Sequence, residues 1–202
     1  YRILPSPNFE IKNTSLNIDT DKELVTFAQV KKMKVYISIL DLYEQKKIKI
    51  KKIDIVNANF SIDNFSFQYV KNFFQNVDLN KTIYIKKSKI FFKEKKIKKE
   101  KTIALATIDR AKIFFDQKDN NNKMIAKGSI YNTGYNLTFL KNINDLNSSS
   151  LLFKLKEINT EFENNLSKVS NNNYNGNASI NLLGNVINIQ YNIKEKLVTF
   201  SS

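Results

Sequence analysis

The feature that most constrains this fold is an alternation of apolar and polar residues. It is clearest from Ile187 to Ile193 and from Ile83 to Lys86, and residues 33–39 show it as well. Consecutive side chains of a β-strand point to opposite faces, so the alternation predicts strands that are covered on one face only. Asn- and Asp-rich turns separate these runs. We therefore expect a mainly β fold of roughly ten strands, joined in sequence as an antiparallel meander.

A short repeat predicts that this sheet is curled. Eight-residue units start at Phe9, Ile48, Ile83 and Ala106, each with apolar residues at positions 1, 3 and 8. Position 8 has the opposite parity, so all three positions share a face only if the strand contains one extra residue, a β-bulge. Bulges at matched places would curl the sheet into an open hydrophobic groove. The alternative is that unrelated strands share a generic β pattern.

One segment has helical rather than strand periodicity. Within residues 64–77, four apolar side chains have the spacing of an amphipathic helix: Val70, Phe73, Phe74 and Val77. A second helical turn is expected over residues 39–45. We interpret both as short helices packed on the sheet, and we expect residues 1–202 to form a single domain.

The composition excludes several kinds of active site. The chain has no Cys and no His, which removes thiolate and imidazole chemistry and the ligands of most zinc sites. Its four Gly residues do not form a phosphate-binding loop. No carboxylate pair has the setting of a catalytic or calcium site. We expect no catalytic residue, no metal and no cofactor, and therefore not an enzyme.

The formal charge of +14 first suggests an anionic partner. The chain has 31 Lys, 29 Asn and 25 Ile but only two Arg, a composition that AT-rich codons favour and nucleic-acid binding does not. We therefore expect no nucleic-acid partner. Lysines cluster over residues 46–52 and 93–101. In the second cluster, Lys95, Lys96, Lys98 and Lys99 are candidates for contact with a membrane surface, or they protect a strand edge from aggregation.

Three consecutive segments and one later segment resemble a known family. Residues 4–18, 30–43 and 48–62 resemble the N-terminal pattern of AsmA-family proteins: a strand ending in a short helix, a basic strand and an apolar strand. Residues 127–139, with Gly128 near their start, resemble a later strand pair of that family. The similarity lies in patterns of small and apolar residues, and it covers most of the chain.

The resemblance implies a function in lipid transport. AsmA-like proteins are held in the bacterial inner membrane by one N-terminal helix and extend into the periplasm. They belong with chorein-type bridge proteins, whose hydrophobic groove takes phospholipid acyl chains toward the outer membrane. By this resemblance the chain is the membrane-proximal part of a longer single-pass protein with its anchor upstream. That the sequence begins at Tyr1 rather than Met fits this expectation.

Alternating positions supply the candidate groove-lining residues. They are Val35, Ile37, Ile39, Ile48, Ile50, Ile55, Phe60, Ile83, Ile85, Ile90 and Ile113. One helix is too little to cover so many one-sided strands, and an uncovered apolar face calls for a ligand or partner. Two alternatives remain open. The strands could cover one another in a closed or sandwiched sheet, or the chain could be a non-lipid β-scaffold for outer-membrane assembly partners.

Overall fold

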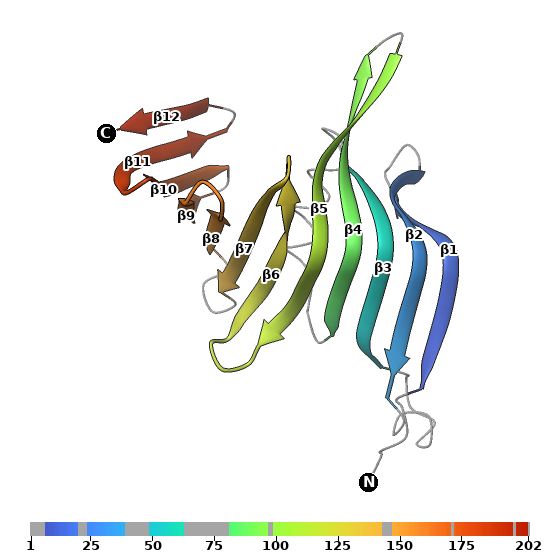
Figure 1. Ribbon diagram of the computed structural model, residues 1–202. Coiled ribbons are helices and arrows are strands. Elements are labelled where there is room, and N and C mark those ends of the chain that lie inside the picture. The colour runs from blue at the N-terminus through green and yellow to red at the C-terminus, as the bar shows by residue number, and fades with distance from the viewer. Residues whose placement is uncertain are drawn as a thin grey trace. The chain divides into compact units, whose positions relative to one another are not determined.

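The computed structural model describes residues 7–19, 24–38, 49–62, 81–96, 99–142, 147–170, 172–195 and 197–201. Twelve strands are described, and all belong to one sheet whose order follows the chain (Figure 1). They are β1 (Asn8–Asp19), β2 (Leu24–Ile37), β3 (Ile50–Ile62), β4 (Thr82–Lys96), β5 (Lys99–Asp116), β6 (Asn121–Ile130), β7 (Thr133–Asn142), β8 (Ser148–Leu155), β9 (Thr160–Ser170), β10 (Asn173–Leu182), β11 (Asn185–Lys194) and β12 (Leu197–Ser201).

The expected mainly β fold and the sequential strand order are confirmed. The sheet is open, because β1 and β12 each have one neighbour, so the closed or sandwiched alternative does not hold for the described strands. The expectation of a wholly antiparallel sheet is wrong at one place, where β3 and β4 pair in parallel. A parallel pair needs a long connection that returns the chain to the same end of the sheet, and residues 63–81 provide that length. The two predicted helices lie outside the described residues.

The chain divides into two compact units, Tyr1–Lys112 and Ile113–Ser202, and each is described by itself. In the first unit, the pairing register of β1 to β4 places apolar side chains in rows. One such row consists of Ile11, Met33, Ile55 and Ile85. Charged and aromatic polar side chains occupy the opposite face. The alternation in the sequence thus becomes two chemically distinct faces.

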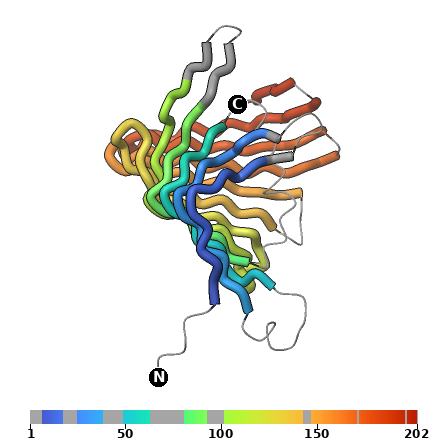
Figure 2. Tube along the Cα trace, turned by 90° about the vertical axis from the view of Figure 1, so that its right-hand side faces the viewer, coloured from blue at the N-terminus to red at the C-terminus, as the bar shows by residue number. Residues whose placement is uncertain are grey.

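The predicted change of inward parity occurs in the first unit, but at kinks that neighbouring strands share and not at bulges. Asn13 in β1, Asn57 in β3 and Lys87 in β4 have positive φ angles of 48°, 56° and 50°. In β3, Ile55 is buried before this point, and Ala58 and Phe60 are buried after it, so the inward parity changes. The pairing register is the same on both sides of these positions, which means that neighbouring strands deviate together. Figure 2 shows that strands of this unit bend along their length.

The second copy, residues 48–55, contains the predicted extra residue. Ile37 pairs with Ile50 and Tyr36 pairs with Lys52, so the register between β2 and β3 shifts at this place. The unit that pairs with the copy in β4 starts at Ile53, however, since Ile53 pairs with Ile83. Starts at Ile48 and at Ile53 both place apolar residues at positions 1, 3 and 8, so the sequence pattern fits either. In β5 the fourth copy shows the parity change too, with Ile108 buried before it and Ala111 and Ile113 buried after it.

A buried serine supplies a hydrogen-bond acceptor to the backbone at the kink that β3 and β4 share. The Ala58 N–H donates a hydrogen bond of 3.0 Å to Ser88 Oγ, and that hydroxyl donates to the Lys86 carbonyl at 2.9 Å. Ser88 is 2% exposed. A buried backbone donor without an acceptor is costly. The Ser88 hydroxyl supplies the acceptor for the Ala58 N–H, which accounts for a polar residue at an inward position of the repeat.

The second unit is a meander of hairpins. Tyr131 and Asn132, between β6 and β7, both have positive φ, as do Leu183 and Gly184 between β10 and β11. Two consecutive residues of this kind form the turn whose twist suits a two-residue hairpin loop. The pairing register of β6 to β11 shows no shift except at the first residues of β10. Each face of this unit therefore keeps a constant parity along its strands.

Candidate functional site

The candidate site is the apolar face of the first unit. It is made of inward side chains of four strands: Phe9, Ile11 and Leu16; Met33, Val35 and Ile37; Ile50, Ile53, Ile55 and Phe60; Ile83, Ile85 and Ile90. Exposure rises toward the β1 edge. Ile55 and Ile83 are 7% and 8% exposed, whereas Ile11 and Phe9 are 40% and 61% exposed. The face thus offers apolar surface that the described strands leave partly open.

Most predicted lining residues meet on this face. It contains Val35, Ile37, Ile50, Ile55, Phe60, Ile83, Ile85 and Ile90. Ile39 and Ile48 lie outside the described residues. Ile113 belongs to the second unit, where it is buried in β5. The prediction missed Phe9, Ile11, Leu16, Met33 and Ile53. The first three occupy positions 1, 3 and 8 of the first repeat copy, and Met33 starts the alternating run of residues 33–39. Ile53 starts the unit in β3 that pairs with the copy in β4.

The opposite face of the same strands is charged. The Glu10 carboxylate lies 3.1 Å from Lys32 Nζ and 3.4 Å from Lys34 Nζ. Farther along, Lys52 lies 3.0 Å from Asp54, and its ammonium is 4.5 Å from the Tyr36 ring centroid. These contacts hold the lysines over neighbouring strands and keep the face hydrated. An apolar ligand would therefore meet only one face of this part of the sheet.

Acid should weaken the first unit through Glu10. The hydrogen bond from Lys32 lowers the pKa of this carboxyl below its ordinary value of 4.5. A lowered pKa contributes stability above pH 4.5 that is lost as the pH falls through the folded-state value. We expect Glu10→Gln to reduce stability slightly at pH 7 and to differ little from the wild type well below pH 4.5, as measured by urea unfolding. An equal difference at both pH values would contradict this assignment.

The second unit also has one apolar face. A row of cross-strand partners runs over β7 to β11 and consists of Leu137, Phe153, Phe162, Ile180 and Ile187. The rings of Tyr135 and Phe153 stack at 5.7 Å between centroids. Lys141 lies at the end of this face in β7 and is 8% exposed. Burial lowers the pKa of its ammonium group.

The described part of the second lysine cluster lies at the ends of two strands. β4 continues to Lys96 and β5 begins at Lys99, and the two strands are neighbours in the sheet. Lys98 is outside the described residues, and the side chains of Lys95, Lys96 and Lys99 are not described. Their contact with a membrane surface stays a prediction.

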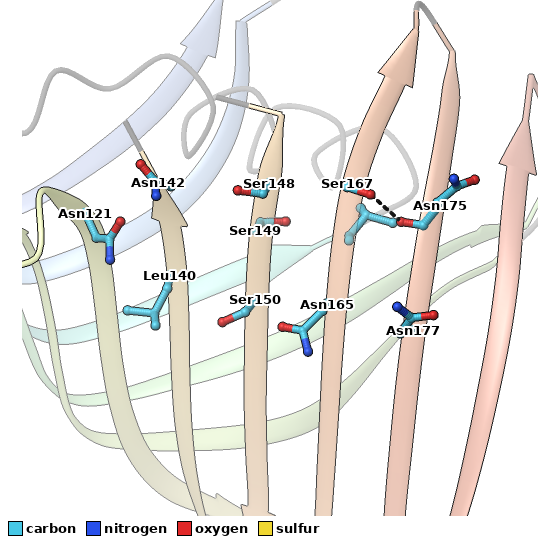
Figure 3. Close-up of a pocket in the computed structure, with 11 residues that line it drawn as sticks. Asn121, Leu140, Asn142, Ser148, Ser149, Ser150, Asn165, Ser167, Asn175 and Asn177 are labelled. Carbon is cyan, nitrogen blue, oxygen red and sulfur yellow. Dashed lines mark hydrogen bonds between the residues drawn. The ribbon is translucent and has the colours of Figure 1, made fainter. Parts of the chain in front are cut away.

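Hollows are found on the other side of the second unit. Three of them, with volumes of about 310, 390 and 490 Å³, are lined mainly by Asn and Ser side chains of its polar face. Figure 3 shows the first of these hollows. The predicted apolar groove is not confirmed: the structure shows an apolar face, and these three hollows lie on the polar face of the second unit.

Within the described ranges, no group of three or more Asp or Glu residues could hold a metal ion. No described helix is long and apolar enough to cross a membrane. No model of a known protein family matches this sequence. A search of curated proteins also finds no match.

Proposed function

We propose that this chain is a lipid-binding module that carries phospholipid acyl chains on an apolar sheet face. The observation that carries the proposal is the one-sided chemistry of β1 to β4, whose apolar rows reach the exposed Phe9 and Ile11 at the sheet edge. Strands β1 to β4 are consecutive neighbours in the sheet, so none of these four strands forms a second layer over this face. A bound acyl chain would remove the remaining apolar area from water.

The energetics suit a hydrocarbon ligand. Each buried methylene contributes about 0.8 kcal/mol, so even partial cover of an acyl chain gives useful affinity. Adjacent strands are about 4.8 Å apart, and a row across four strands therefore spans about 14 Å. The aligned kinks at Asn13, Asn57 and Lys87 keep these rows on one face on both sides of the bend. The opposite face of these strands is charged and would not bind an acyl chain, so the ligand would lie on the apolar face only.

The resemblance to AsmA-like proteins supports the cellular setting of this proposal. The module would act on the periplasmic side of the bacterial inner membrane, in a chain anchored by one helix, and would take phospholipid toward the outer membrane for its biogenesis. The lysine-rich ends of β4 and β5 would approach anionic headgroups, a contact worth about 1 kcal/mol per Lys close to a charged surface.

A second function is favoured by one observation, the exposed edge at β12. Leu197 and Phe200 are 74% and 72% exposed on this terminal strand, which has one neighbour. A strand edge with apolar side chains can pair with a strand of another protein. The chain would then be a scaffold for outer-membrane assembly partners, with no lipid bound.

Native mass spectrometry distinguishes these two functions. We expect the protein, produced in a Gram-negative bacterium and purified without detergent, to carry a diacyl phospholipid that solvent extraction releases. A sample stripped of lipid should take up phospholipid again from vesicles. A protein with a β-type circular dichroism spectrum that neither carries nor takes up phospholipid would overturn the lipid proposal and leave the scaffold function.

A further inference from the structure

The polar face of the second unit carries two parallel rows of amides and hydroxyls. The first row runs across β8 to β12 and consists of Ser150, Asn165, Asn177, Gln190 and Ser201. The second crosses the same strands with Ser148, Ser167, Asn175, Asn192 and Thr199. Partners in a row are about 4.8 Å apart, the spacing of neighbouring strands. The result is a regular array of uncharged hydrogen-bonding groups.

The three hollows share lining residues along these rows, and we call the three together the polar trough. Asn177 lines all three, Asn165 lines the first and second, and Gln190 lines the second and third. Among the lining residues only Glu163 is charged, and it accepts a hydrogen bond of 3.1 Å from Asn165 Nδ2. No Lys or Arg lines the trough, although the chain as a whole has a formal charge of +14.

An unsatisfied acceptor lies in the first hollow. Asn121 lines that hollow together with side chains from β7 to β10 (Figure 3). Its Oδ1 atom is buried and has no hydrogen-bond partner. A buried acceptor without a donor is unfavourable, and a ligand donor at this place would remove the cost. This observation is independent of the rows and points to a hydrogen-bonding ligand.

Part of the array is held in place before any ligand binds. Asn192 Nδ2 donates to Asn173 Oδ1 at 3.0 Å and to Asn175 Oδ1 at 2.6 Å. Ser167 Oγ donates to the Asn175 carbonyl at 3.3 Å. These contacts orient amides of the second row and reduce the rotamer entropy that binding would otherwise cost.

The geometry points to a neutral oligosaccharide as the ligand of the polar trough. An extended molecule with many hydroxyl groups can donate to the amide oxygens and accept from the amide nitrogens of several strands at once. The lack of basic side chains disfavours an anion. A peptide would make its main-chain bonds at a strand edge rather than on a sheet face. This inference concerns the face opposite the apolar row of the same unit, so it does not depend on lipid binding.

Side-chain amide resonances of isotopically labelled protein test the inference. The probes are three neutral hexasaccharides: maltohexaose, cellohexaose and chitohexaose. We expect at least one to shift the amides of Asn165, Asn177 and Gln190 saturably. Asn177→Ala should weaken that binding about tenfold, the factor for one or two lost hydrogen bonds. The matched control is Asn136→Ala, since Asn136 is exposed in β7 and does not line the trough.

Several results would overturn the inference. They are the absence of saturable shifts with all three hexasaccharides, equal weakening by Asn177→Ala and Asn136→Ala, and shifts with a twelve-residue Gly-Ser peptide instead of the saccharides. Circular dichroism of each variant checks the fold. If Asn177→Ala does not fold, Gln190→Ala replaces it, because Gln190 is exposed and lines two of the three hollows.

Discussion

Replacing Ile85 with Asp should remove bound phospholipid from the purified protein, whereas replacing Val56 with Asp should leave it bound. Both residues are partly exposed and lie in adjacent strands. Ile85 pairs with Ile55 on the apolar face, so a carboxylate there would have to lose water against hydrocarbon, which costs several kcal/mol. Val56 pairs with Lys32 and Lys86 on the charged face. A carboxylate there gains cross-strand attraction of about 0.2–1 kcal/mol.

The measured quantity is phospholipid per protein by solvent extraction, with an expected fall of at least about tenfold for Ile85→Asp. Phe9→Asp covers the case in which Ile85→Asp does not fold, because Phe9 is 61% exposed at the sheet edge and its loss should cost little stability. It should reduce lipid loading less than Ile85→Asp but more than Val56→Asp. Equal loading in folded Phe9→Asp, Val56→Asp and wild-type protein would contradict an apolar-face site.

Gly176→Ala should destabilise the second unit by about 1–3 kcal/mol, the usual effect of overpacking. The Tyr191 ring lies across Gly176 so closely that an added Cβ would overlap it. The ring is held there by a hydrogen bond of 2.7 Å from its hydroxyl to Asn164 Oδ1. In an ordinary strand position, Gly to Ala stabilises by about 0.5–1 kcal/mol. The sign of the effect therefore tests whether the ring occupies this place.

Urea unfolding of a double-mutant cycle measures this contact. In a Tyr191→Ala background the cost of Gly176→Ala should largely disappear, because the ring that the Cβ overlaps is gone. The pair should therefore show a coupling energy of about 1–3 kcal/mol. Independent, additive effects of the two substitutions would show that Tyr191 does not cover Gly176 in solution.

The comparison of sequence and structure is most instructive at the repeat. Its first and third copies predict where the inward parity changes, because the change from position 3 to position 8 is local to each strand. The unit in β3 that pairs with the third copy starts at Ile53 and not at Ile48, and only the pairing with Ile83 shows this. The sequence pattern alone cannot distinguish the two starts, since both place apolar residues at positions 1, 3 and 8.

The direction of β4 is a second property that the sequence pattern did not predict. The sequence marks residues 64–77 as a segment of a different kind, and a long connection of this sort is what a parallel pair requires. Strand periodicity does not encode direction, however, and the antiparallel prediction treated this segment as an addition to a meander. The direction of β4 became known only from its pairing with β3.

By itself, the sequence determined that the strands are one-sided, where the inward parity changes in the first and third copies of the repeat, and which chemistry the chain lacks. These properties depend on residue type and on parity within single strands, which are local. The tertiary structure decided which strands pair, in which direction and in which register. Register brings Asn165, Asn177 and Gln190 into one row and lays Tyr191 over Gly176. Such contacts join residues of different strands, and the alternation of each strand is compatible with many registers.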